Sequence, residues 1–173
     1  LITVRMPAID PLTAGGSQCA NVVGQIQLSF IGIDCPSGVN AVDFTYKVDP
    51  PQIQSATPTA YNQDGSPAGS PLGSAPATVT VNGAFFQDPM TVVLTRADGT
   101  AIDYTRVNNP IVSNVATLTF PAPAIRNGEL NEQACLIDGT PSGNKYVPTS
   151  FGIRVRNVRT GCETYVPNLL VYN

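Results

Sequence analysis

The four cysteines are the residues of this chain whose chemistry is easiest to specify. Cys19 and Cys35 lie near the start, and Cys135 and Cys162 lie near the end. A structural zinc site needs closely spaced Cys and His ligands, but the chain has no C-x2-C spacing and no histidine. Disulfides are therefore favoured over metal, and they predict an oxidising compartment. Four cysteines allow three pairings, which spacing alone does not decide.

Enzymatic chemistry has few candidate residues. The absence of histidine removes the usual general base, the Ser-His-Asp triad and the Cys-His pair. A carboxylate pair could serve glycoside hydrolysis, and the pool for it is Asp98, Asp103, Glu129 and Glu132. Turn and surface positions explain these carboxylates equally well. We therefore predict no catalysis and no cofactor.

Two long loops, 61–75 and 127–148, are candidate contact loops, because loops of this length are uncommon unless functional or mobile. Tyr61 and Tyr146 are the exposed contact residues we prefer there, although packing over their own loops is the alternative for each. Asn62 and Asp64 begin an Asn-x-Asp-Gly segment, but the further carboxylates of a calcium loop do not follow. A turn is predicted there, and no metal.

The charge pattern disfavours nucleic acid as a partner. Nine basic and twelve acidic residues give a net charge of -3, and they are scattered along the chain. The densest basic group is Arg154, Arg156 and Arg159, where alternation predicts an exposed, solvated strand face for the first two. No apolar run reaches the roughly 18 residues that a membrane helix needs, so no membrane span is predicted.

The sequence predicts that β-strands position these residues. Charged residues make up 12% of the chain, while 15 glycines and 16 prolines punctuate it, as in short strands joined by turns. The stretch 75–103 alternates and contains an Asn82-Gly83 and an Asp98-Gly99 turn signal. Further strands are expected over 2–6, 25–33, 42–48, 116–121, 151–158 and 166–172.

The two halves of the chain show the same order of strands and cysteines. A strand, a cysteine, a strand, a second cysteine and a strand occur within residues 1–48 and again at the end of 49–173. This match predicts the pairs Cys19–Cys35 and Cys135–Cys162. It also predicts that 1–48 is the C-terminal half of one repeat and that 49–173 is a complete one. A single enlarged sandwich is the alternative.

Residues 51–120 resemble the IPT/TIG family of immunoglobulin-like domains. The resemblance rests on Pro51, Ile53, Ser55 and Pro58, followed by the Val-Thr-Val-x-Gly-x-x-Phe strand and bulge of Val79 to Phe86. It implies an all-β, immunoglobulin-like antiparallel β-sandwich. It also implies a spacer or interaction module of a cell-surface or secreted protein. The loop 61–75 and the cysteines depart from the family pattern.

Together these patterns predict a non-catalytic, extracellular structural or assembly module of a bacterial surface or secreted protein. Three strands in 1–48 would leave an apolar face uncovered, so we expect other copies of the chain or neighbouring immunoglobulin-like domains as partners, in a filament formed by strand addition. The opening LITVRMPAID has no signal-peptide pattern, which suggests a processed chain or a fragment. The alternative is an adhesion module that binds a glycan or a surface protein through loops 61–75 and 127–148.

Overall fold

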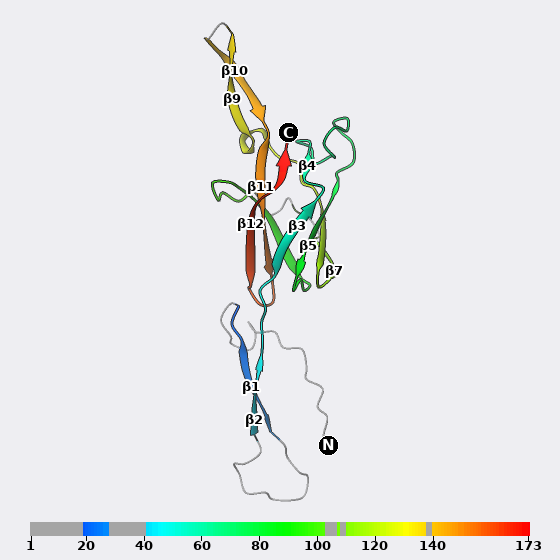
Figure 1. The fold of residues 1–173 in the computed structure, drawn as a ribbon, viewed down its shortest axis with the longest axis vertical. Coiled ribbons are helices and arrows are strands. Elements are labelled where there is room, and N and C mark those ends of the chain that lie inside the picture. The colour runs from blue at the N-terminus through cyan, green and yellow to red at the C-terminus, as the bar shows by residue number, and fades with distance from the viewer. Residues whose placement is uncertain (1–18, 28–40, 103–106, 108–109, 138–139) are drawn as a thin grey trace, which may run out of the picture.

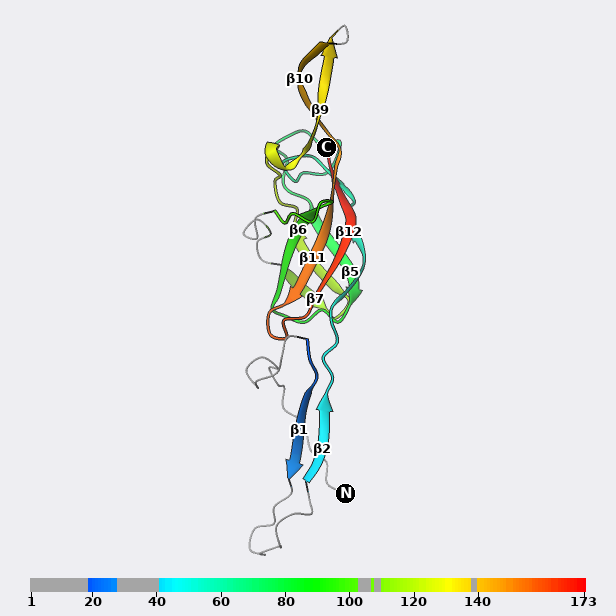
Figure 2. The same ribbon diagram turned by 90° about the vertical axis from the view of Figure 1, so that its left-hand side faces the viewer.

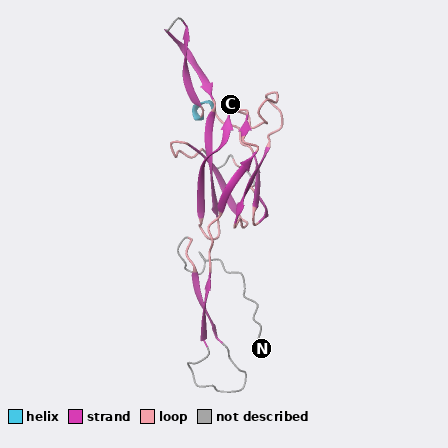
Figure 3. Cartoon of the chain, viewed as in Figure 1, coloured by secondary structure: helices cyan, strands magenta, loops and turns pink. Residues whose placement is uncertain are grey.

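The computed structural model describes residues 19–27, 41–102, 107, 110–137 and 140–173. In this part of the chain nearly all regular structure is β-strand, with one turn of 3-10 helix (Figure 3). The elements are β1 (Val22–Gln27), β2 (Ala41–Tyr46), β3 (Gln52–Thr57), β4 (Ala60–Tyr61), β5 (Thr78–Ala84), β6 (Met90–Arg96), β7 (Ile111–Asn114), β8 (Thr117–Pro121), η2 (Asn127–Glu129), β9 (Asn131–Ile137), β10 (Thr140–Val147), β11 (Thr149–Asn157) and β12 (Glu163–Tyr172).

Two four-stranded sheets form a β-sandwich, which confirms the predicted fold class. The first sheet has the order β3-β5-β8-β7 and the second β4-β12-β11-β6. All pairings are antiparallel except that of the short β4, which runs parallel to the end of β12.

The core lies between the two sheets because alternate residues of each strand point inward. Val79 and Val81 of β5 are fully buried, as are Ile153 and Val155 of β11. Aromatic rings close one end of the core, where Tyr172 stacks on Tyr61 with ring centroids 5.3 Å apart. This continuous apolar layer makes the sandwich the stable body from which the other elements project.

Two ribbons of two strands each project from the sandwich at opposite ends. The first ribbon consists of β1 and β2, and the second consists of β9 and β10. Both views place the first ribbon below the sandwich and the second above it, so the molecule is elongated (Figures 1 and 2). The second ribbon is inserted between β8 and β11, which are successive strands of the sandwich along the chain.

Most predicted strands of the sandwich are confirmed, including those over 116–121, 151–158 and 166–172. The Asp98-Gly99 turn is confirmed, because Gly99 has a φ of 86° and Asp98 accepts a bond from the Thr100 amide. Gly83, by contrast, lies inside β5, where a Cβ atom would meet the Gln52 carbonyl oxygen at 1.8 Å. Glycine is needed there for close approach of two strands, not for a turn.

The predicted polar loop 127–148 is wrong, because η2, β9 and β10 occupy most of it. A ribbon exposed on both faces needs no alternation of apolar and polar residues, so the sequence carries no strand signal. The strand predicted over 42–48 corresponds to β2. The strand over 25–33 begins earlier, at Val22, and residues 28–33 lie outside the described residues, as does the strand over 2–6.

The predicted disulfide pairs are also wrong. Cys19 is bonded to Cys162, at a sequence separation of 143, and Cys135 is a free cysteine. Cys35 lies outside the described residues. The prediction assumed that each cysteine pairs inside its own repeat, whereas the structure joins the first ribbon to the far end of the chain. The division at residue 49 and the half repeat stay predictions.

Candidate functional site

The first ribbon has two unlike faces. Its antiparallel register sets Val22 opposite Tyr46 and Gly24 opposite Phe44. Residues directly opposite each other share a face of the ribbon, so Val22, Tyr46, Phe44 and Val42 lie together. Val23 lies on the other face, where Gln25 Nε2 donates to Asp43 Oδ1 at 2.7 Å. The ribbon is therefore apolar on one face and largely polar on the other.

The apolar face is organised by two aromatic rings. Phe44 and Tyr46 meet edge to face with centroids 5.2 Å apart. The Phe44 ring also lies across Gly24, where a Cβ atom would be 2.5 Å from Phe44 Cζ. Val42, on the same face, remains 65% exposed. Within the described residues no other strand packs over β1 and β2, which make their main contacts with each other.

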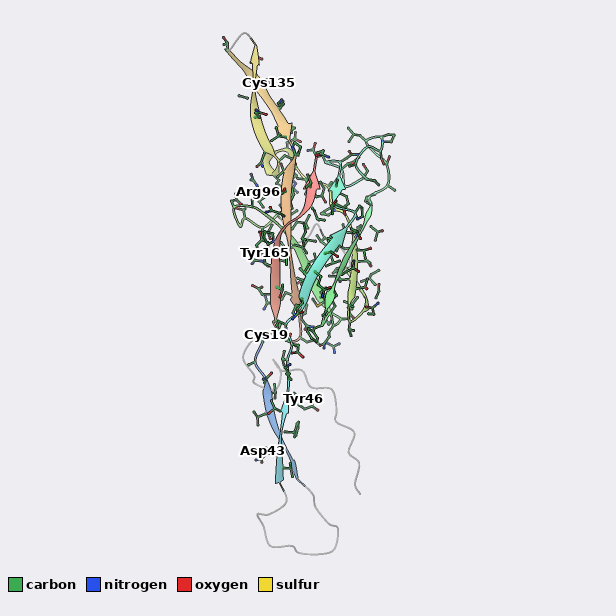
Figure 4. The ribbon with its side chains drawn as sticks, viewed as in Figure 1. Cys19, Asp43, Tyr46, Arg96, Cys135 and Tyr165 are labelled. Carbon is green, nitrogen blue, oxygen red and sulfur yellow. A yellow bond between two sulfur atoms is a disulfide. The ribbon has the colours of Figure 1, made fainter. Side chains whose placement is uncertain are left out.

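A covalent clamp holds this ribbon to the sandwich. Cys19 lies just before β1, and Cys162 lies in the turn between β11 and β12. Beside the disulfide, the Cys19 amide donates to the Thr160 carbonyl at 2.9 Å. Figure 4 places Cys19 at the junction, with Asp43 and Tyr46 further along the ribbon.

The turn that carries Cys162 is built around one buried asparagine. Asn157, 3% exposed, accepts from the amides of Arg159 and Thr160 through Oδ1 and donates to the Gln87 carbonyl through Nδ2. The Asn157 amide donates in turn to the Cys162 carbonyl at 2.8 Å. These bonds satisfy buried polar groups and fix the position of the half-cystine.

The chain itself makes a second connection between ribbon and sandwich. The segment after β2 leads into β3, and the Val48 amide donates to Asn21 Oδ1 at 2.9 Å. Thr164 of β12 donates its hydroxyl to the Pro51 carbonyl. Two attachments on neighbouring parts of the sandwich limit rotation of the ribbon more than a single linker would.

The predicted contact residue Tyr61 is not exposed. Its ring is fully buried against Tyr172, and its hydroxyl donates to the Pro58 carbonyl. Burial raises the pKa of Tyr61 to about 12. Burial and the neighbouring Tyr61 also raise the pKa of Tyr172, whose hydroxyl has no partner among the described residues. The prediction of an exposed Tyr61 is wrong because β4 pairs with the end of β12.

Asn62 and Asp64 are used inside their own loop. Asn62 Nδ2 donates to the Pro67 and Ser70 carbonyls at 3.0 and 2.9 Å. Asp64 accepts from the hydroxyl and amide of Ser66 and from the Gly73 amide. The Ser66 hydroxyl, followed by the Gly73 amide, holds the pKa of the Asp64 carboxyl below its ordinary value. This loop is therefore internally cross-linked by hydrogen bonds.

The second ribbon carries the other predicted contact residue. Tyr146 lies on β10, opposite Glu132 of β9, and is 43% exposed. Figure 4 places Cys135 on the same ribbon, far from Cys19. The binding function predicted for 61–75 and 127–148 stays a prediction, and Tyr146 is its remaining exposed aromatic residue.

The carboxylates of the enzyme alternative lie on different elements. Asp98 accepts from the Thr100 amide, which holds the pKa of its carboxyl below the ordinary value. Glu129 lies in η2 and accepts from the Arg126 amide, Glu132 lies on β9, and Asp103 lies outside the described residues. The residues that the structure describes include no group of three or more His, Cys, Asp or Glu able to hold a metal ion.

Comparison with protein-family models, curated proteins and solved structures finds no match to this chain. The site must therefore be interpreted from its own geometry. The disulfide is compatible with an oxidising compartment. Across the described residues, no helix has the length and apolar character required to cross a membrane.

Proposed function

We propose that this protein is a non-catalytic, extracellular structural module that associates with other copies of itself through its first ribbon. The observation that carries the proposal is the apolar face of that ribbon, which lies outside the sandwich and has no covering sheet among the described residues. A ribbon of two strands is at best marginally stable in water, and a third or fourth strand or a covering layer stabilises it.

A second copy is the occupant that the geometry favours. Both edges of the first ribbon lack a paired strand among the described residues, so a copy can add strands at an edge and cover Phe44 and Val42 at once. The disulfide clamp supports this role, because it presents the ribbon in a restricted orientation and lowers the entropy lost on association. The resemblance to IPT/TIG domains of surface proteins supports the same class of function.

The test uses two matched substitutions on the two faces of the ribbon. Val42→Asp places a charge on the apolar face, and Val23→Asp places the same charge on the polar face, where Val23 is 69% exposed. Sedimentation velocity over a range of concentrations is expected to show association of the unsubstituted protein and of Val23→Asp, and a monomer for Val42→Asp. A monomer at every concentration for the unsubstituted protein would refute self-association.

A further inference from the structure

The outer face of the second sheet carries two arginines in a regular arrangement. The register places Val93 of β6, Arg154 of β11 and Tyr165 of β12 in one row across the sheet. The next row consists of Thr91, Arg156 and Glu163. Ile153 and Val155 of the same strand belong to the core, so Arg154 and Arg156 lie on the opposite face.

This face is hollowed into a cleft with a volume of about 320 Å³. Val93 and Val107, 5% and 8% exposed, line its apolar part together with Pro110. Arg154, Arg156 and Glu163 line its polar part. A mostly apolar hollow with a few converging polar groups is the usual form of a small-molecule site, and this volume lies at the small end of the usual range. The sequence predicts a solvated strand face here and misses the cleft.

Arg154 is held in place but its charge is not neutralised by the described residues. Its guanidinium carbon lies 5.7 Å from the centroid of the Tyr165 ring, within the range of a cation–π contact. Its Nε atom is buried and has no hydrogen-bond partner in this part of the structure. Among the described residues the structure shows one ion pair, and it does not involve Arg154. It joins Lys47 to Asp49, on the linker that precedes β3. A buried donor without an acceptor is costly, and an anion beside it would remove that cost.

The charges of the cleft indicate the kind of anion. Arg154 and Arg156 contribute two positive charges and Glu163 one negative charge, so the described residues of the lining carry a net charge of about +1. A single carboxylate fits this balance better than a phosphate or a dense polyanion. Guanidinium groups also bind carboxylates through two parallel hydrogen bonds.

We propose that this cleft binds an acidic sugar of monosaccharide size, with its carboxylate on Arg154 and Arg156. Thr91 and Glu163 offer a hydroxyl and a carboxylate to the hydroxyl groups of the sugar, and the apolar part of the cleft takes the face of the ring. This binding site lies on the sandwich and does not depend on association through the first ribbon.

The experiment is an NMR titration of the Val42→Asp variant, which separates ligand binding from self-association, or of the unsubstituted protein if it is monomeric. D-Glucuronate is the probe. D-Glucose has the sugar ring without the carboxylate, acetate has a carboxylate without the ring, and both serve as controls. Saturable shifts of the Val93, Arg154 and Tyr165 amides are expected with glucuronate, and weaker binding with glucose and acetate. No saturable shift at the cleft with glucuronate would refute the proposal, and equal binding of acetate would refute the sugar assignment.

Arginine substitutions test the geometry of the site. Arg154→Gln is expected to lower the affinity for glucuronate roughly tenfold or more, because it removes charge-assisted hydrogen bonds. Arg159→Gln removes the same charge from the exposed turn after β11, outside the cleft, and should leave the affinity unchanged. Arg154→Lys keeps the positive charge but lacks the planar guanidinium group that forms two parallel hydrogen bonds. It replaces Arg154→Gln in the test if that variant fails to fold. Equal loss in Arg159→Gln would show long-range charge attraction and refute the site.

Discussion

The two ribbons of this molecule are attached to the same sandwich by different means. The first is a separate hairpin that reaches the sandwich through a linker and the Cys19–Cys162 disulfide. The second is continuous with the sandwich, because Pro148 is the one residue between β10 and β11. At its base the Asn131 amide donates to Thr149 Oγ1 at 2.7 Å, and Arg96 donates to Asn131 Oδ1 at 3.3 Å.

The two ribbons also differ in the polarity of their surfaces. The second ribbon is polar near its base, where water can solvate both of its faces, because four of its polar residues are exposed: Asn131, Glu132, Gln133 and Lys145. The first ribbon gathers Val42, Phe44 and Tyr46 on one face. A polar ribbon can stand alone if its base is rigid, whereas an apolar ribbon needs both an anchor and a cover. The comparison therefore predicts that changes at the first ribbon are more costly than equivalent changes at the second.

The largest difference is expected for the cysteines. Loss of the disulfide in Cys19→Ser should lower the free energy of unfolding by up to about 5 kcal/mol, the chain-entropy value for a separation of 143 residues. Cys135→Ser, on the second ribbon, is the matched control and should have little effect. Urea unfolding under non-reducing conditions measures both. Equal losses of unfolding free energy in Cys19→Ser and Cys135→Ser would show that the disulfide does not stabilise the attachment of the first ribbon.

The next difference concerns the asparagines at the two bases. Asn157→Ala should lower the free energy of unfolding by about 2–3 kcal/mol, because it leaves the buried Thr160 amide and the part-buried Arg159 amide and Gln87 carbonyl without their partner. Asn131→Ala removes an exposed bond to Arg96 and should cost about 0.5 kcal/mol or less. Thermal unfolding of both variants gives the ranking. An equal or reversed ranking would contradict the role of the Asn157 turn.

A smaller difference is expected between the stacked tyrosines beside the second ribbon, where Tyr172 pairs with Thr149. Tyr61→Phe loses the bond to the Pro58 carbonyl and should cost about 1 kcal/mol. Tyr172→Phe removes a buried hydroxyl that has no described partner and should be neutral or stabilising. Urea unfolding distinguishes them, and a marked loss in Tyr172→Phe would mean that its hydroxyl has a partner.

The smallest effect is a pH dependence in the loop 61–75. The folded-state pKa of Asp64 is depressed, so its contribution to stability is present above the ordinary carboxyl pKa and is lost as pH falls through the lower folded value. Acid titration followed by NMR should release the Ser66 and Gly73 amides together. Asp64→Asn should abolish this step, and a step that survives in the variant belongs to another group.

The strands and turns of the sandwich could be predicted because burial of one strand face and backbone preferences in turns leave patterns in neighbouring residues. Val79 and Val81 alternate with threonines since one face of β5 is buried, and Asp98-Gly99 forms a turn from its own backbone preferences. Val22 escaped the predicted strand because the two-stranded ribbon begins without a clear alternating pattern. The confirmed predictions and the error at Val22 all depend on residues that are neighbours in the sequence.

The site was harder to predict because it depends on contacts distant in sequence. The Cys19–Cys162 bond joins segments that the repeat pattern placed in separate units. Tyr61 is buried through pairing of β4 with β12, which no property of the loop 61–75 reveals. Alternation predicts the correct face for Arg154 and Arg156, but it does not reveal that Val107 and Pro110, distant in sequence, line a cleft on this face.

The disulfide also determines how a pulling force would travel through the molecule. A force applied to the chain before Cys19 and after Tyr172 would pass across the sulfur–sulfur bond to Cys162 and then along β12. The chain between the two cysteines, which includes both ribbons and most of the sandwich, would lie outside the covalent path of tension. Such a link would limit how far the protein can be stretched, whichever strands separate first.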